Sequence, residues 1–94
     1  MSPSRLADDV VARELAATPG WAREGDAIAR TWRFVDFKAA MFFVNGVAAL
    51  AEKAGHHPDV AIHYNEVTLR LWSHDAGGLT ARDFDLARTV SATL

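Results

Sequence analysis

The segment from Asp36 to about Ala54 constrains this 94-residue chain most, because it is predicted to form a helix that is apolar nearly all round. Asp36 can cap the helix N-terminus, and Gly55 can end it in the left-handed conformation that glycine adopts readily. The helix has one narrow polar stripe that repeats every seven residues: Lys38, Asn45 and Glu52. A surface helix of a monomer normally buries a single apolar stripe. So small a domain cannot surround this helix, so we expect part of it to contact another subunit, with Phe43 and Val47 among the outward positions.

The other segments show helical and strand patterns in turn. Apolar residues recur at helical spacing from about Ser4 to Ala17, and Pro19-Gly20 ends that helix. Two strand pairs are expected, residues 21–23 with 27–34 across a glycine-containing connection, and residues 60–64 with 67–73 across Asn65-Glu66. A last helix begins at Thr80, where Asp83 three residues later makes an approximate capping box.

The order α-β-β-α-β-β-α predicts an α+β fold, with a four-stranded antiparallel sheet and helices packed on one face. Within the last strand, side-chain alternation places three residues on one face of the sheet: Val67, Leu69 and Leu71. The chain contains no internal repeat, linker or low-complexity stretch, so we expect residues 1–94 to form a single domain.

The composition excludes several classes of function. The chain has no cysteine, which rules out disulfides, thiolate nucleophiles and sulfur-ligated zinc. Its net charge is −2 and its ten basic residues are scattered, whereas nucleic-acid binders cluster them on one face. The sequence shows no signal-peptide pattern and no apolar run that could span a bilayer. We therefore expect a cytoplasmic protein that binds neither nucleic acid nor membrane.

All four histidines lie between residues 56 and 74, and imidazole is the side chain best suited to proton transfer near neutral pH. His56 and His57 follow a helix C-terminus, whose negative dipole end stabilises an imidazolium, and Pro58 stiffens their loop. His74 ends a strand and opens a glycine-bearing loop. The alternatives stay open at this point: solvated loop histidines, or a zinc site, although the usual His-x₃-His spacing is missing. His63 can simply occupy the open face of the sheet.

Other side chains could assist such a site. The three tryptophans, Trp21, Trp32 and Trp72, are more than a core this small needs, and any of them could stack on a flat heteroaromatic ligand. Core packing is the simpler explanation for each. Glu52 lies four residues before His56 and could hold its ring, or it could be an ordinary solvated helix residue.

Two sequence blocks together resemble the pterin-4a-carbinolamine dehydratase family. The first is Glu52-Lys53-Ala54-Gly55-His56-His57-Pro58, followed by Tyr64-Asn65. The second is the uninterrupted block Trp72-Ser73-His74-Asp75-Ala76-Gly77-Gly78-Leu79-Thr80-Ala81-Arg82-Asp83. Further family positions are matched upstream by Gly20-Trp21 and Asp36-Phe37-Lys38. The resemblance covers nearly the whole chain after the first helix, and a lone His-His-Pro would be a much weaker signal.

The resemblance implies the same α-β-β-α-β-β-α fold and a lyase that removes water from 4a-hydroxytetrahydropterin. The product is quinonoid dihydropterin, and the step completes recycling of the pterin after an aromatic amino-acid hydroxylase has used it, without metal or cofactor. The implied catalytic residues are His56, His57 and His74. The resemblance also implies that Trp21 lies beside the pterin, with Glu52 and Asp83 in support.

Within that site, we expect His56 and His74 to transfer protons and His57 to hold the pterin. Two residues beside the expected site depart from the family pattern. Gly55 stands where some members carry an acidic residue, and Val60 stands where some carry an aromatic one.

Two alternative functions come from other classes. Some animal members of the family also bind a homeodomain transcription factor and stabilise its dimer through the apolar helix used for self-association, which would make this chain an interaction module. A homologue that binds a pterin without converting it is the other alternative, and the intact His56, His57 and His74 argue against it. A homodimer or homotetramer explains the apolar helix more simply.

Overall fold

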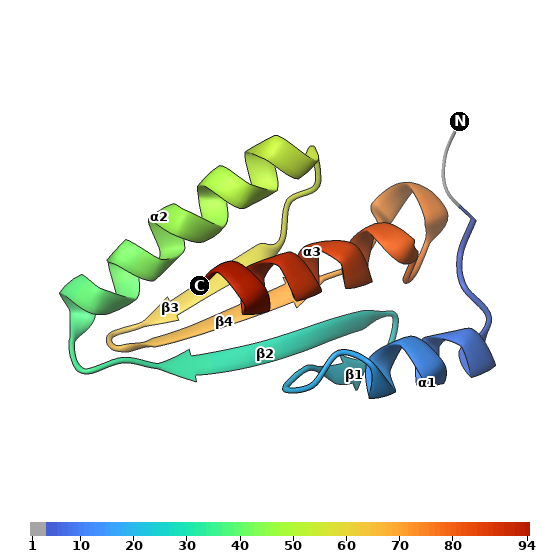
Figure 1. The fold of residues 1–94 in the computed structure, drawn as a ribbon, viewed down its shortest axis with the longest axis horizontal. Helices are drawn as coiled ribbons and strands as arrows, with labels where there is room; N and C mark the ends of the chain where they lie inside the picture. The colour runs from blue at the N-terminus through green and yellow to red at the C-terminus, as the bar shows by residue number, and fades with distance from the viewer. Residues whose placement is uncertain (1–3) are drawn as a thin grey trace.

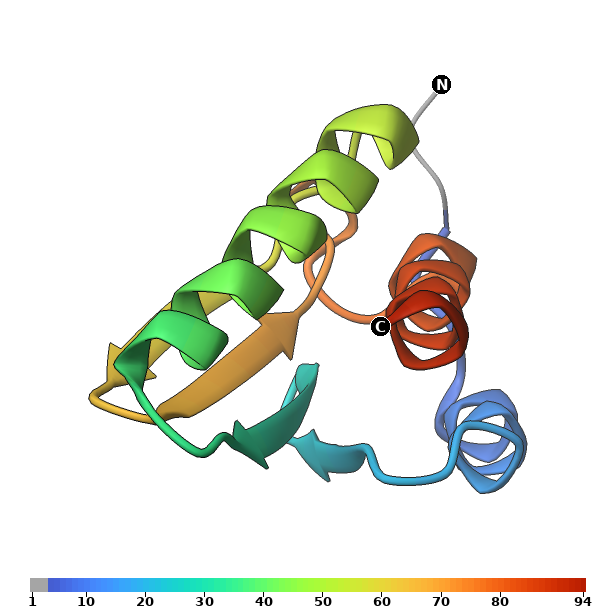
Figure 2. The same cartoon turned by 60° about the vertical axis from the view of Figure 1, so that its left-hand side comes forward.

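The computed structural model describes residues 4–94 and has the predicted order of elements. They are α1 (Asp8–Ala16), β1 (Ala22–Glu24), β2 (Ala27–Arg33), α2 (Phe37–Ala54), β3 (Asp59–His63), β4 (Glu66–Leu71), the 3₁₀ turn η1 (His74–Ala76) and α3 (Ala81–Thr93). The strands form one antiparallel sheet in the order β1-β2-β4-β3. Helices α2 and α3 lie on one side of this sheet (Figure 1, Figure 2). The predicted α+β fold is confirmed.

The faces of the sheet also follow the prediction. Val67, Leu69 and Leu71 of β4 are buried against the helices, whereas Thr68 and Arg70 between them are only partly buried. The antiparallel pairing of β2 with β4 extends this buried face into β2, where Ile28 lies opposite Leu71. Among residues 4–94, no helix combines the length and the apolar character that a membrane span needs.

Helix α2 begins and ends where the capping residues predict. The Asp36 Oδ1 accepts a hydrogen bond of 2.8 Å from the Ala39 N–H, and Gly55 ends the helix with a φ of +65°. One stripe of α2 is buried against the sheet: Ala40, Phe43, Val47 and Ala51. Phe42 on the other side of the helix is 83% exposed. The expectation that Phe43 and Val47 point outward is therefore wrong, because an almost uniformly apolar helix does not reveal in sequence which stripe meets the sheet.

The first helix is shorter than its apolar pattern predicts. It begins at Asp8 instead of near Ser4. The Leu6 N–H donates to the Leu79 carbonyl at 2.8 Å, so Leu6 is held by the loop before α3 and not by a helical turn. Its helical spacing in the sequence is therefore coincidental.

The second hairpin turns one residue earlier than expected. Glu66 pairs with His63 within the sheet, so the turn consists of Tyr64 and Asn65 instead of Asn65 and Glu66. Tyr64 adopts a left-handed φ of +56°, and the Asn65 side-chain amide donates to the Phe34 carbonyl at 2.9 Å. The asparagine thus ties the turn to the end of β2.

Candidate functional site

Three segments that are distant in sequence meet at one end of the sheet. They are the loop after α2, the chain leaving β4 through η1, and the first turn of α3 (Figure 1). Together they form a pocket of about 430 Å³. Its lining consists of Gly55, His56, His57, Pro58, Asp59, Trp72, His74, Asp75 and Arg82. All three histidines that the sequence singles out as catalytic candidates therefore line one pocket.

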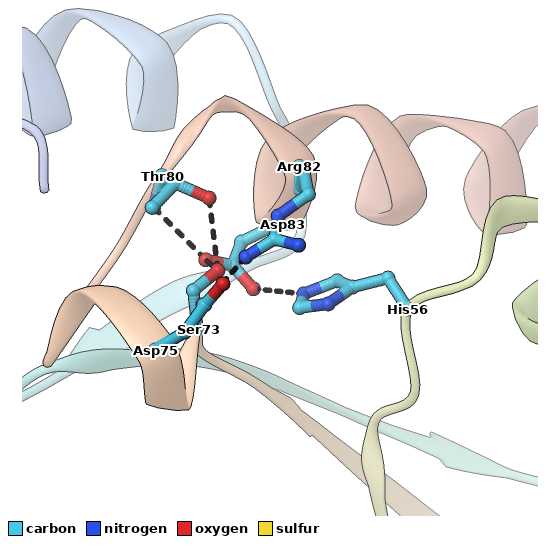
Figure 3. A network of polar contacts seen from close by, with 6 residues as sticks. All are labelled: His56, Ser73, Asp75, Thr80, Arg82 and Asp83. Atoms are coloured by element: carbon cyan, nitrogen blue, oxygen red, sulfur yellow. Dashed lines mark hydrogen bonds and ion pairs between the residues drawn. The ribbon is translucent and has the colours of Figure 1, made fainter. Parts of the chain in front are cut away.

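His56 is held from behind by a buried carboxylate. Its Nε2 lies 2.6 Å from the Asp83 Oδ1, and Asp83 is completely buried (Figure 3). The other oxygen of Asp83 accepts from the Ser73 hydroxyl and from the Thr80 N–H, each at 2.9 Å. A buried carboxylate is costly unless hydrogen bonds satisfy it, and these contacts do so. With Nε2 donating to Asp83, Nδ1 is the nitrogen of His56 that remains available to exchange a proton.

Local sequence explains why these groups converge. Asp83 is the third residue of α3 and completes the predicted capping box with Thr80, so helix initiation itself fixes the carboxylate. At the other side, the left-handed Gly55 lets the His56 N–H return to the Ala51 carbonyl at 3.2 Å. The end of α2 and the start of α3 therefore place His56 and Asp83 against each other.

His57 lies in a different environment. Its Nε2 is 2.5 Å from the Glu52 Oε2, and both side chains are largely exposed. Glu52 is therefore the partner of His57 and not of His56, contrary to the expectation from the four-residue spacing. The C-terminal turn of α2 directs His56 inward and His57 toward solvent, where the end of α2 carries Glu52.

His74 is the first residue of η1 and packs against a tryptophan. The centroid of its ring lies 3.7 Å from that of Trp72, with 35° between the planes. Its neighbour Asp75 accepts a hydrogen bond of 2.6 Å from the Arg82 Nη2. Sequence reasoning did not assign roles to Asp75 and Arg82, although both lie within the second family-like block. Trp72 and His74 are two residues apart, a spacing that places both on the same side of an extended chain.

The structure does not bring every predicted residue to this pocket. Trp21 is 5% exposed and packs in the core, where its Nε1 donates to the Ser91 hydroxyl at 3.1 Å. Trp72 is the tryptophan that lines the pocket. Asp83 lies behind His56 instead of on the wall, so its geometry suits orienting a histidine better than touching a substrate. His63 lies on β3, outside the pocket lining.

A metal site is the other chemistry that clustered histidines can support. Among residues 4–94, no three histidine, aspartate or glutamate side chains converge in a way that could hold a metal ion. The groups that line the pocket and can exchange protons are imidazoles and carboxylates.

Comparison with known proteins identifies the family. A sequence model of the family described as pterin 4 alpha carbinolamine dehydratase matches residues 4–93. The chain belongs to this family. Similar proteins carry that name provisionally. One from Thermomicrobium roseum is 53% identical over 88 residues, covering 94% of this chain and 95% of the relative. One from Acidobacterium capsulatum is 50% identical over 91 residues, covering 97% and 99%.

Two solved structures also resemble this chain. A transcriptional coactivator/pterin dehydratase from Brucella melitensis superimposes with a TM-score of 0.89 at 35% identity, covering 95% of this chain and 97% of its own. A pterin dehydratase-like protein described as a RuBisCO assembly factor in the alpha-carboxysome gives a TM-score of 0.66 at 22% identity, covering 78% and 87%. The second likeness concerns the fold alone.

Proposed function

We propose that the protein is a 4a-hydroxytetrahydropterin dehydratase, a hydro-lyase that forms quinonoid dihydropterin in tetrahydropterin recycling. The observation that carries the proposal is the convergence of His56, His57 and His74 on one pocket, with His56 anchored to the buried Asp83. Family membership and relatives about half identical over nearly the whole chain support it. The pocket volume of about 430 Å³ falls in the range of small-molecule sites.

The reaction needs one proton donor and one proton acceptor. The C4a–O bond breaks as a protonated imidazole gives its proton to the departing hydroxyl, which leaves as water. The N5–H bond breaks as a neutral imidazole takes that proton, and its electron pair forms the new double bond between N5 and C4a. One histidine loses a proton and the other gains one, so the enzyme's charge is unchanged. Each of these transfers is typically worth 10²–10⁴-fold in rate.

We assign the transfers to His56 and His74, and the holding of the pterin to His57. His56 has a partner that fixes its orientation and leaves Nδ1 free, and His74 is stacked on the pocket wall by Trp72. His57 is exposed at the edge of the pocket, so its ring can contact the substrate without being held by a buried carboxylate. The proposed substrate contact of Trp21 has no support in the pocket geometry, and Trp72 is better placed for it.

The decisive measurement is the decay of a 4a-hydroxytetrahydropterin with and without the purified protein. We expect acceleration that survives treatment with a chelator. His56→Ala and His74→Ala should each lower kcat by about 10²-fold or more, because each removes a proton-transfer group. His57→Ala should mainly raise KM. His63→Ala is the matched control, since His63 lies on β3 away from the pocket, and it should leave turnover unchanged.

Several outcomes would contradict this assignment. An unaccelerated decay would leave an interaction module or a pterin-binding protein as the better function. A loss of rate with chelator would reject a metal-free mechanism. A loss in His63→Ala equal to that in His74→Ala would mean that the wrong histidine was assigned.

We further propose that the chain forms a homodimer or homotetramer, acts as one domain and works in the cytoplasm. The observation behind self-association is the apolar surface left on α2 and on the edge strand β3, where Phe42 is 83% and Val60 43% exposed. An apolar groove lies between these elements, lined in part by Val44, Ala48 and Val60. Cell fractionation tests the location, and light scattering tests the oligomeric state.

A further inference from the structure

We propose that Arg82 and Asp75 are positioning residues that hold the η1 turn, and with it His74, in place for catalysis. The inference rests on the proposed dehydratase function, since it concerns the orientation of one of its histidines. Neither residue needs to touch the substrate for this role. Arg82 acts through Asp75, and Asp75 acts through the backbone that it shares with His74.

The first turn of α3 reaches toward both histidines at once. Asp83 contacts the His56 ring directly, with 2.6 Å between its Oδ1 and the ring Nε2. Arg82, the preceding residue, extends toward η1, and its Nη2 lies 2.6 Å from the Asp75 Oδ1 (Figure 3). Two consecutive residues of one helix therefore connect to His56 and to the neighbour of His74. The relative placement of the two histidines depends on this single helical turn.

The η1 turn is closed at its base by a β-bridge between Ser73 and Gly78, and His74 packs on Trp72, but few contacts hold the turn itself against α3. It is three residues long, and its backbone hydrogen bonds are long, with 3.2 Å from the Ala76 N–H to the Ser73 carbonyl and 3.3 Å from the Gly77 N–H to the His74 carbonyl. It ends at Gly77, which adopts a left-handed φ of +70°. Within the described residues 4–94, the contact of Asp75 with Arg82 is the only side-chain hydrogen bond from η1 to another element.

The Arg82 guanidinium occupies its position although one donor is left unsatisfied. Its Nε is buried and has no hydrogen-bond partner among the described residues. Such a donor is unfavourable, so the guanidinium needs a compensating contact to remain in the pocket wall. The ion pair with Asp75 supplies that contact, although the two side chains remain 39% and 44% exposed. A charge-assisted hydrogen bond from an arginine to a carboxylate also fixes the relative position of the two side chains better than a neutral hydrogen bond does.

The stack of His74 on Trp72 provides a direct readout of position. A ring centroid 3.7 Å from an indole experiences a large ring-current shift, so NMR signals of the His74 ring report its place over Trp72. We expect Arg82→Gln and Asp75→Asn each to move these signals toward those of an unstacked histidine. Because misplacement of a catalytic group by about 1 Å can cost about 10²-fold, each variant should also lower kcat by between about 10-fold and 100-fold, with little change in KM.

Double substitution separates positioning from direct contact. The Arg82→Gln/Asp75→Asn protein should be no worse than either single variant, because both act through one ion pair. Arg82→Lys, which keeps a positive charge for Asp75, should recover most of the rate. Arg33→Gln is the matched control: it breaks an ion pair with Glu66, 3.1 Å long, at the other end of β4, and it should change neither kcat nor the His74 signals.

Three results would overturn the inference. The His74 signals could stay unchanged in both single variants, the losses of rate could add in the double variant, or Arg82→Gln could raise KM while Asp75→Asn has no effect. The last result would make Arg82 a direct substrate contact. If the unmodified protein proves inactive, the proposed function fails, but the NMR comparison still decides whether Arg82 and Asp75 position His74.

Discussion

At the scale of single residues, Asp83 links the folding of α3 to the orientation of His56. Its two oxygens accept hydrogen bonds from the His56 ring, the Ser73 hydroxyl and the Thr80 N–H, and it has no exposed surface. The Thr80 N–H belongs to the N-cap of α3, Ser73 precedes η1, and the third donor belongs to the proposed catalytic histidine. A change at this carboxylate should therefore affect stability and turnover together.

Asp83→Asn tests that coupling with almost no change in side-chain volume. The amide NH₂ would replace one of the two acceptor oxygens, so it would face either the Ser73 hydroxyl and the Thr80 N–H or the His56 Nε2. A buried donor that meets another donor typically costs about 1–3 kcal/mol. We expect a loss of that size in the free energy of unfolding, measured with urea, together with a lower kcat. Asp85→Asn is the control on the same helix, because Asp85 is 74% exposed and only 3.7 Å from Arg88. A stable, fully active Asp83→Asn protein would contradict this account.

The sequence predicts this site only in part. Imidazole chemistry draws attention to the four histidines, but the choice of His56, His57 and His74 and the supporting role of Asp83 come from the family resemblance. The capping-box spacing by itself places Asp83 only at the start of the last helix. The choice among Trp21, Trp32 and Trp72 depends on tertiary packing, which residue spacing does not encode. Arg82 and Asp75 escape notice for a related reason: a contact across seven residues of loop and helix has no periodic signature.

At the scale of elements, local signals outperform patterns of hydrophobicity. Asp36, Gly55 and Thr80 mark the helix ends correctly because each cap depends on a few neighbouring backbone groups. The apolar pattern of α2 leaves its buried stripe undetermined, and Leu6 imitates a helical position that it does not occupy. The hairpin turn lies one residue earlier than expected because Tyr64 adopts a left-handed φ. Tyrosine is not a residue type that marks such a position in a sequence.

Gly55 provides a test at this scale, because its φ of +65° is needed to end α2 just before His56. A Cβ added to Gly55 would meet no atom within 4 Å, so any cost of substitution comes from the backbone and not from a clash. Gly55→Ala should lower the free energy of unfolding by about 1–2 kcal/mol, the usual penalty of a left-handed alanine. Gly55→Asn should cost less, since asparagine tolerates this conformation. Equal losses in the two variants, compared by urea unfolding, would show that φ is not the cause.

At the scale of the whole molecule, the edge of the sheet and α2 leave apolar side chains uncovered. β3 is an edge strand whose five residues are all exposed, and its Val60 and Ile62 point to the same face as the buried Leu69 and Val67. Large apolar side chains are also exposed around the start of α2: Val35 at 87%, Phe37 at 50% and Phe42 at 83%. An unpaired edge beside an apolar helix is prone to association unless another chain covers it.

Self-association through this surface is the prediction that belongs to the whole molecule. Burying one large apolar side chain is worth about 1.5–3 kcal/mol, and a symmetric contact counts each residue twice, which can offset an association cost of about 4–15 kcal/mol. Light scattering at micromolar concentration should therefore report a dimer or a tetramer.

Phe42→Glu places a charge in the exposed patch and should shift the protein toward monomer with its circular dichroism intact. Phe43→Glu should unfold it instead, because Phe43 is 6% exposed and packs against Trp32 and Phe34. Ala12→Glu adds the same charge at an exposed position of α1 and should leave the mass unchanged. A monomer at every concentration, or equal dissociation by Phe42→Glu and Ala12→Glu, would rule out α2 as the interface.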